Sequence, residues 1–374
     1  MANRKPIAKK LIRLALQQAG LVSAEQCDAT GVGASRRSEL VARGEWRRVT
    51  RGVFDTGEVP GHLHSYDVDR LRSVWSALLA NRRAIAVGAC ALMLHGVKGL
   101  PRRLVPEAAL PKGSFRKARD GIVFRQYAPR TGIVEIHGRL VVALVDAFVQ
   151  ALPALTREQA IACLDSALHQ RLLQVEQLDV IRRRLRHHKG SAKVIAWLPL
   201  ANGRAESPPE SHARLACVDA GVAPDDLQRD FFDTRGRFLG RADMVWHLGN
   251  GRWLIVEIDS QEFHGAERQV QRDATRQNGL LGEGQNIILR FFPSHVSGGH
   301  FVGEVAQVLR REHWQPARRL PPRESRRRRA PAKIDHAVTA EYGRDSAVTA
   351  WSVRGQTAAA DGGVPSVAAS GASR

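Results

Sequence analysis

Apolar residues recur at helical spacing near the N-terminus. Residues 7–20, IAKKLIRLALQQAG, place apolar side chains three and four positions apart and end in Gly20, which predicts a helix that stops there. A second short helix follows, with Ser23 as its expected N-cap. GASRRSELVARGEW (33–46) predicts a helix that carries arginines, and WRRVTRGVF (46–54) alternates in polarity like a pair of strands.

Helix, helix, basic helix and basic hairpin is the element order of a winged helix-turn-helix, expected over residues 1–57. In such a fold one helix enters the major groove of DNA and the hairpin, or wing, follows the phosphates. The expected DNA contacts are therefore Arg36, Arg37, Arg43, Arg47, Arg48 and Arg51. The alternative is a small helical subdomain whose basic face is only solvated.

Residues 58–195 predict a mixed α/β domain. Helical patterns surround two β-like stretches, GIVFRQY (121–127) and IVEIHGRLVV (133–142). No catalytic constellation is visible there, and Asp146 and Asp165 are expected on helix surfaces or at helix ends. The domain is interpreted as a connecting or sensing element.

A new module is expected over residues 200–315. Ser207 is a candidate N-cap with prolines in the following turn, so Glu210 would lie early on a helix. FLGRADMVWHL (238–248) and WLIVEID (253–259) predict two strands, and the intervening GNGR is a strong hairpin signal.

Three carboxylates gather on these two strands. The period of two puts Glu257 and Asp259 on the same strand face as Trp253 and Ile255. If Asp243 lies on the neighbouring strand, its carboxylate can converge with that of Glu257. Carboxylates are depleted in strands and are costly to bury unless they are paired or bind a metal ion, so either a solvated hairpin or a metal site is expected.

A basic helix and a last strand complete the module. GAERQVQRDATRQNGLLGEG (265–284) predicts a helix on which Arg268, Arg272 and Arg276 recur every four residues, and NIILRFF (286–292) predicts a strand, followed by His295 in a turn. This layout suits metal-dependent hydrolysis of DNA phosphodiesters. Oxygen ligands suit Mg²⁺ or Mn²⁺, the metal would activate water, and the arginines would hold the phosphate backbone.

The segment from Glu206 to about His295 resembles the PD-(D/E)xK nuclease superfamily, and within it the domains related to the very short patch repair endonuclease (Vsr). The resemblance implies a restriction-endonuclease-like α/β/α fold. It also implies that Asp243 and Glu257 are metal ligands, that Glu210 is an accessory acid, and that His264 transfers protons. Asp259 stands where the superfamily pattern has Lys, and would add a metal ligand or position water. Ser260 stands where these relatives have Gly.

VSAEQCDATGVGASRRSELVARGEWRRVTRGVF (22–54) resembles the winged-helix start of AbiEi-type antitoxins, which are regulators of toxin–antitoxin systems. GACALMLHG and the helices after it are similar to the body that follows in those proteins. The resemblance covers roughly the first 190 residues. It implies a DNA-binding regulator that could control its own operon, with a cognate toxin and a homodimer as candidate partners.

Charge and composition agree with a nucleic-acid partner. The 374 residues carry a formal net charge of +20, which favours a polyanion. No apolar run is long enough to cross a membrane, and the four cysteines form no CxxC pair, so reduced, buried thiols in a cytoplasm are expected. Residues 316–374 are rich in Arg, Pro and Ala and predict a disordered tail, in which Arg326–Arg329 would bind phosphates without sequence preference.

Together these patterns predict an α/β multidomain protein of the cytoplasm, associated with the nucleoid. The first hypothesis is a DNA endonuclease that depends on Mg²⁺ or Mn²⁺. The alternative is an antitoxin-type transcriptional regulator whose nuclease-like domain is inactive. RNA processing is a third, weaker hypothesis, because basic charge does not separate DNA from RNA.

Overall fold

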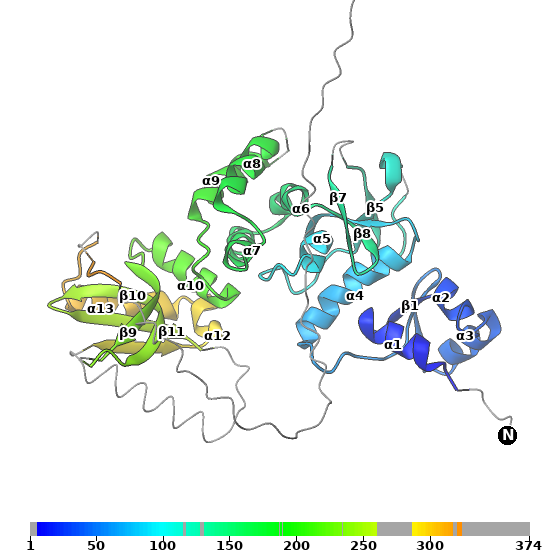
Figure 1. The fold of residues 1–374 in the computed structure, drawn as a ribbon, viewed down its shortest axis with the longest axis horizontal. Coiled ribbons are helices and arrows are strands. Elements are labelled where there is room, and N and C mark those ends of the chain that lie inside the picture. Colours follow the sequence, from blue (N-terminus) through cyan, green and yellow to red (C-terminus); the bar gives the residue numbers. More distant parts are fainter. Residues whose placement is uncertain are drawn as a thin grey trace, which may run out of the picture. The chain divides into compact units, whose positions relative to one another are not determined.

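The computed structural model is a mixed α/β chain with three β-sheets in its described part (Figure 1). It describes residues 6–114, 117–127, 131–186, 188, 190–233, 235–259, 286–316 and 320–323. Within these residues, no helix is long and apolar enough to cross a membrane.

The N-terminal region has the element order of a winged helix. Its elements are α1 (Lys9–Gln17), β1 (Leu21–Ser23), α2 (Ala24–Asp28), α3 (Ala34–Ala42), β2 (Arg47–Thr50) and β3 (Val53–Asp55). The prediction of three helices and a basic hairpin is confirmed, and Ser23 caps α2 in a capping box with Gln26. The sequence pattern missed β1, which pairs antiparallel with β3 and completes the sheet β1-β3-β2.

The middle region combines a five-stranded sheet with helices. The elements are α4 (Ser65–Leu79), β4 (Ile85–Ala86), α5 (Gly88–Leu94), β5 (Glu107–Ala109), β6 (Val123–Arg125), β7 (Ile133–Ile136), β8 (Arg139–Val142), α6 (Leu144–Ala151), α7 (Arg157–His169), α8 (Val175–Leu185) and α9 (Ser191–Trp197). The strand order is β6-β5-β4-β8-β7. Gly99 has φ +91 and lies so close to α7 that an added Cβ would come within 2.7 Å of the Ala162 Cβ, so only glycine fits there.

In its described residues the C-terminal region keeps the predicted order of helix, strand hairpin and last strand, and the basic helix predicted over residues 265–284 lies outside them. Its elements are α10 (Pro208–Asp219), β9 (Asp226–Phe232), β10 (Phe238–Gly249), β11 (Arg252–Ile258), β12 (Ile287–Phe291), α12 (Pro293–Ser297) and α13 (His300–Arg311). The sheet order is β12-β11-β10-β9, with β11 and β12 parallel and the other pairs antiparallel. Asn250 and Gly251 both have positive φ in the β10–β11 turn, as the GNGR pattern predicts.

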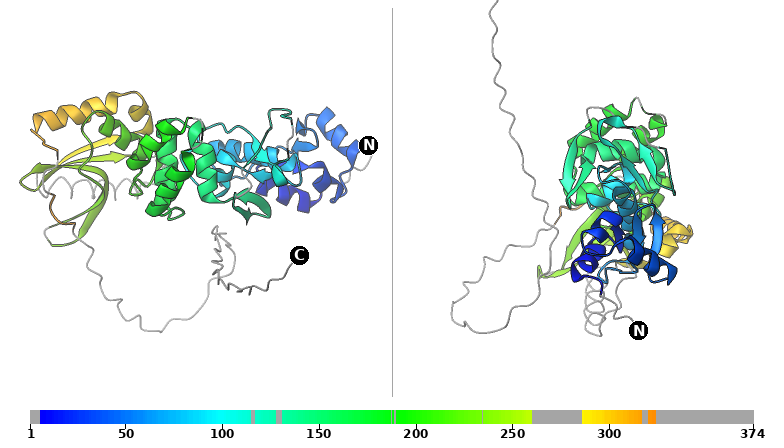
Figure 2. Two further views of the ribbon diagram at one scale, coloured as in Figure 1. Left: turned by 90° about the horizontal axis from the view of Figure 1, so that it is seen from above. Right: turned by 90° about the vertical axis from the view of Figure 1, so that its right-hand side faces the viewer.

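Two helices cover one face of this four-stranded sheet. Phe301 and Val305 of α13 and Ala213 of α10 belong to the same buried cluster as Met244 and Leu254 of the sheet. Figure 2 shows α13 lying against the strands. The alternation expected along β11 is also present, because Leu254 faces this cluster and Ile255 belongs to a separate one on the other side.

The structure corrects the expectation for Asp165. This residue is fully buried rather than at a helix surface, since its carboxylate accepts from the guanidinium of Arg214 and from the backbone N–H of Asn202. Burial without these partners would be costly, so the pair holds α7 and α10 together.

Two more expectations were wrong. His295 lies in the short helix α12 and not in a turn, because Pro293 begins a helix there. Leu320–Arg323, expected within the disordered tail, are placed by contacts with β9. The predicted domain boundaries at 57, 195 and 315 stay predictions, and residues 324–374 lie outside the described residues.

Candidate nucleic-acid interface and acidic cluster

The arginines expected to contact DNA divide into two groups. Arg43, Arg47, Arg48 and Arg51 are exposed, and Arg36 is partly exposed. The side chain of Arg47, 73% exposed, makes an ion pair with the buried carboxylate of Asp55 and still faces solvent. These five side chains form the wing and helix surface, which can reach phosphates.

Arg37 belongs to the interior instead. Its side chain donates to the carbonyl oxygen of Val32 at 2.7 Å and pairs with Asp28, and it lies over the Phe54 ring. The residue as a whole is 8% exposed. These contacts fix α3 against α2 and the wing, so the structure gives Arg37 a role in shaping the winged helix rather than in contacting DNA.

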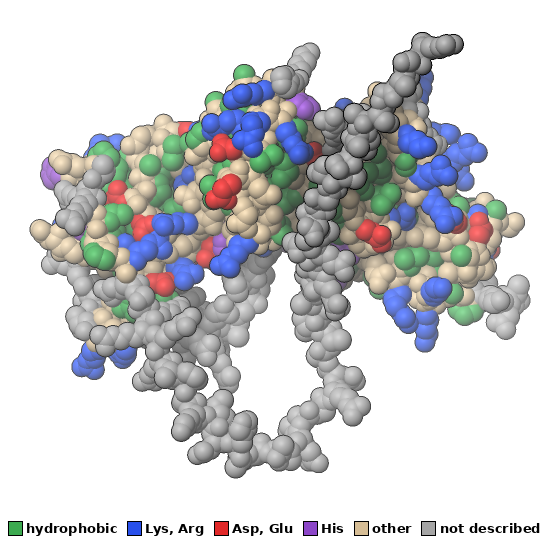
Figure 3. Space-filling view, turned by 45° about the horizontal axis from the view of Figure 1, so that its top comes forward, with side chains coloured by type: hydrophobic (Ala, Val, Ile, Leu, Met, Phe, Trp, Pro, Cys, Tyr) green, Lys and Arg blue, Asp and Glu red, His purple; other side chains and the backbone are tan. Residues whose placement is uncertain are grey.

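Positive charge is not confined to this surface. On the face drawn in Figure 3, Lys and Arg side chains gather in several groups, and fewer Asp and Glu side chains lie among them. A net charge of +20 is therefore spread over the chain, which favours contact with a polyanion over more than one region.

An acidic cluster forms where α10, β9, β10 and β11 meet. Asp243 lies one position beyond the Met244–Val256 register pair, which places Glu257 opposite it on β11. The backbone N–H of Ile258 donates to Asp243 Oδ2 at 2.8 Å. The predicted convergence of Asp243 and Glu257 is therefore present in the structure.

Gln228 joins this cluster to Glu210. Its amide Nε2 donates to Glu210 Oε2 at 2.9 Å and to Asp243 Oδ1 at 3.2 Å. The hydroxyl of Ser207, the predicted N-cap of α10, donates to Glu210 Oε1 at 2.7 Å, and the prediction of this cap is confirmed. Gln228 has φ +49, a strained conformation for a residue with a side chain, and such strain is common at functional sites.

The electrostatics of Asp243 follow from this setting. Burial, and then the negative charges of Glu210 and Glu257, raise the pKa of the Asp243 carboxyl to about 7, although hydrogen bonds from Ile258 and Gln228 oppose the shift. Carboxyls with such raised pKa values occur at proton-transfer sites and at metal sites that lack their cation.

The two carboxylates at the C-terminal end of β11, Glu257 and Asp259, differ from each other. Glu257 is buried, and its Oε2 lies 2.9 Å from Arg290 Nη2 on β12. Asp259 follows the strand and is half-buried, with its backbone N–H bonded to the Phe291 carbonyl. Within the described residues, no group of three or more His, Cys, Asp or Glu side chains is arranged to hold a metal ion.

Several expected site residues lie outside the described residues. These are His264, Ser260 and the arginines Arg268, Arg272 and Arg276, together with Arg326–Arg329 of the tail. The roles predicted for them stay predictions.

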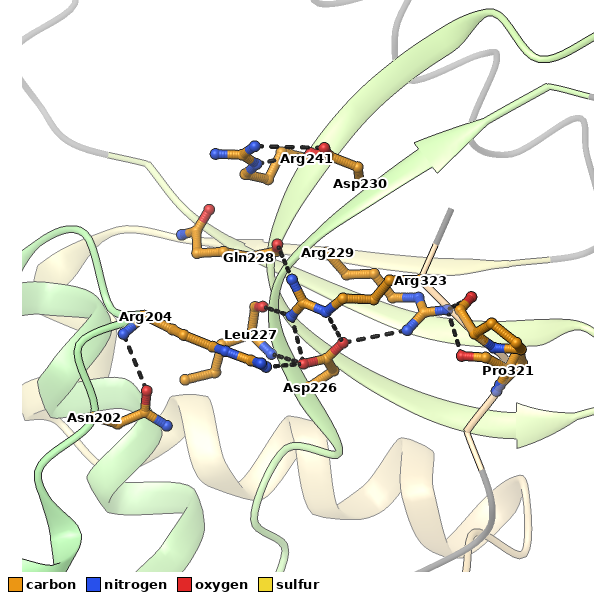
Figure 4. Close-up of polar contacts among 11 residues, drawn as sticks. Asn202, Arg204, Asp226, Leu227, Gln228, Arg229, Asp230, Arg241, Pro321 and Arg323 are labelled. Atoms are coloured by element: carbon orange, nitrogen blue, oxygen red, sulfur yellow. Dashed lines mark hydrogen bonds and ion pairs between the residues drawn. The ribbon is translucent and has the colours of Figure 1, made fainter. Parts of the chain in front are cut away.

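Sequence reasoning also missed a cluster of arginines beside the acidic site. Figure 4 shows three guanidinium groups converging on the Asp226 carboxylate, those of Arg204, Arg229 and Arg323. Arg229 also donates to the carbonyl oxygens of Pro321 and Pro322, and Leu320 packs against the sheet. These contacts hold residues 320–323 along β9. The only sequence signal was the alternation of Asp and Arg in DLQRDF, which resembles an ordinary surface strand.

Residues 9–54 match the family model described as "Transcriptional regulator, AbiEi antitoxin". The match spans α1 to β3, the elements that have the order of a winged helix. It agrees with the resemblance seen in residues 22–54 and concerns this part of the chain alone.

Two curated relatives come from Mycobacterium tuberculosis, uncharacterized protein MT2308 of strain CDC 1551 / Oshkosh and uncharacterized protein Rv2248 of strain ATCC 25618 / H37Rv. Each is 31% identical over 153 residues, which is 41% of this chain and 55% of the relative. The chain thus spans about half the length of the curated relatives it matches. None of these comparisons supports the resemblance to Vsr-like nucleases.

Proposed function

We propose that this protein is a DNA-binding transcriptional regulator of the antitoxin type. The observation that carries the proposal is the winged helix itself, with arginines of α3 and of the wing open to solvent. Helix-turn-helix proteins use such side chains for phosphate and base contacts, which position and specify the complex. The family match over residues 9–54 supports the same function.

Partners and location follow from this function. DNA is the ligand, a cognate toxin encoded beside the regulator is the expected protein partner, and a homodimer would present two winged helices to a palindromic operator. A regulator of this kind works at the nucleoid in the cytoplasm.

A reporter assay tests the regulatory function. The DNA upstream of the gene is fused to a reporter, and expression is measured with and without the protein. Wild-type protein should lower expression, and Arg48→Glu in the wing should relieve that repression, because reversal of charge repels phosphate. Arg183→Glu, on α8 in the middle region, is the matched control and should repress nearly normally. Equal expression with and without the wild-type protein would argue against regulation of this promoter.

A second function is favoured by the raised pKa of Asp243. The Asp243 carboxyl is partly buried between two other carboxylates, and a divalent cation would supply positive charge there. The donors are all oxygens, and Mg²⁺ is often bound through one or two carboxylates and water, so the residues fit Mg²⁺ or Mn²⁺. Asp243 and Glu257 would hold the ion together with water, since Asp259, the third predicted ligand, is not arranged with these two to hold a metal ion.

Under this second proposal the region hydrolyses phosphodiesters. A bound cation would polarise the phosphate and lower the pKa of the attacking water. Gln228 keeps the Glu210 carboxylate beside Asp243, and Arg290 compensates the charge of Glu257. Both side chains would help to orient the carboxylates. Arg290 would also supply a positive charge beside Glu257, as the Lys of the superfamily pattern would.

Nicking of supercoiled plasmid with Mg²⁺ or Mn²⁺ tests this activity. Asp243→Asn and Glu257→Gln should each abolish metal-dependent nicking, whereas Asp230→Asn on the neighbouring strand should retain it. Equal residual nicking by all four proteins would indicate a contaminant. If wild-type protein binds DNA but does not cut it, the nuclease proposal is wrong and the regulator proposal remains.

A further inference from the structure

The tip of the wing is already occupied by another part of the chain. The hydroxyl of Thr50, at the end of β2, donates to Asp120 Oδ2 at 2.7 Å. The backbone N–H of Arg51, in the wing turn, points at the same oxygen at 3.4 Å. One carboxylate oxygen of the middle region therefore accepts from both the Thr50 hydroxyl and the Arg51 N–H.

Asp120 is held out toward the wing by a tight turn. Arg119 and Ile122 form a β-bridge, and the two residues between them, Asp120 and Gly121, have φ of +50 and +79. Both values are left-handed, as in the narrowest hairpin turns. The hydrogen bond from Thr50 is the largest cause that lowers the pKa of Asp120, so this carboxyl is ionised at neutral pH.

A hydroxyl group and a backbone N–H are among the groups that proteins offer to DNA phosphates, and here they belong to Thr50 and to Arg51, whose side chain is exposed. A carboxylate oxygen carries the same sign of charge as a phosphate oxygen. We propose that Thr50 and Arg51 form a phosphate-binding site at the wing tip, and that Asp120 fills it in the free protein. DNA then competes with the 119–122 turn for the wing. This inference rests on the proposed DNA-binding function.

The consequence is a built-in reduction of DNA affinity. Only molecules in which Asp120 has left the wing tip are fully competent, so the apparent dissociation constant exceeds the intrinsic one by the inverse of the competent fraction. A ligand or partner that draws the 119–122 turn away would strengthen DNA binding without touching the DNA.

Equilibrium binding to a labelled 30-base-pair duplex from the upstream region tests the competition. Asp120→Gly removes the carboxylate and suits the left-handed backbone, so the fold should be kept. We expect its dissociation constant to fall about three- to tenfold, the range of one net hydrogen bond. Asp179→Asn, an exposed carboxylate of α8, controls for the change in net charge and should shift affinity less than twofold or so.

A double-mutant cycle with Thr50→Val separates competition from a general effect. Val has the shape of Thr without the donor, so the gain from Asp120→Gly should largely disappear in this background. Weaker binding by Asp120→Gly would show that Asp120 holds the wing in the conformation that binds DNA, and would overturn the proposal. A gain equal to that of Asp179→Asn would overturn it too. If wild type and Asp120→Gly both fail to bind the duplex, the proposed function falls together with this inference.

Discussion

Replacing Asp243 with Asn should stabilise the protein at alkaline pH, whereas loss of a polar contact usually lowers the free energy of unfolding. Asn has nearly the same shape and carries no charge at any pH. In the wild type the Asp243 carboxyl is partly buried beside Glu210 and Glu257, and its pKa is raised from 3.8 to about 7. In the unfolded chain this pKa returns to its ordinary value.

The sign of the pH dependence follows from proton linkage. Between about pH 4 and pH 7 the folded protein holds a proton on Asp243 that the unfolded chain has lost, so the free energy of unfolding falls as pH rises. The full difference of roughly three pH units corresponds to about 4 kcal/mol at 1.36 kcal/mol per unit. The Asp243→Asn protein lacks this decrease in the free energy of unfolding, because Asn does not ionise. It should therefore be more stable than wild type at pH 8.5 and similar to it at pH 4.5.

Thermal unfolding from pH 4.5 to 8.5 measures this difference. Since 1 kcal/mol shifts the Tm of a domain of 150–250 residues by about 2–4 °C, the variant should unfold on the order of 10 °C higher at pH 8.5. The lowered pKa values of the partly buried His95 and His212 affect both proteins equally and cancel in the comparison. Asp230→Asn, which breaks an ion pair with Arg241, is the control and should gain nothing at high pH. A Tm difference between Asp243→Asn and wild type that is the same at pH 4.5 and 8.5 would refute the raised pKa.

Three further outcomes test other parts of the structure. Arg214→Ala leaves the Asp165 carboxylate buried without its cation and should cost about 3–5 kcal/mol of stability, whereas Arg157→Ala, which breaks an exposed ion pair between the same two helices, should cost less than about 1 kcal/mol in the same denaturant titration. Gly99→Ala should lower the Tm by several degrees, because its Cβ would collide with Ala162; an unchanged Tm would contradict the close packing. Burial raises the pKa of all four cysteine thiols, so a thiol reagent at pH 8 should react with them only after denaturation, and rapid reaction of the native protein would contradict this burial.

Local signals in the sequence predicted local structure well. The cap at Ser23, the prolines after Ser207 and the turn at Asn250 depend on neighbouring residues, and all three appear where the pattern places them. The pairing of Asp243 with Glu257 was also predictable, because a short hairpin turn fixes the register of its strands.

Contacts between distant residues were not predictable from these patterns. Arg323 reaches Asp226 across 97 positions, and Asp165 meets Arg214 across 49. Arg37 shares the sequence features of its neighbour Arg36, and only the packing of α3 on α2 separates the buried side chain from the partly exposed one. A single sequence shows which residues are charged. Which of them form buried ion pairs, and which stay exposed and can bind a ligand, depends on contacts made in the folded chain.

The most direct test of the central claim is equilibrium binding of the full-length protein to its upstream DNA at several KCl concentrations. We expect specific binding whose affinity falls steeply with salt, because several phosphates are neutralised by arginines of the wing and helix surface. Arg36→Ala and Arg48→Ala should each weaken binding and reduce the slope of log K against log [KCl] by about 1. A dissociation constant that does not change with KCl concentration, or that is the same in both variants as in the wild type, would contradict the assignment of this surface to DNA.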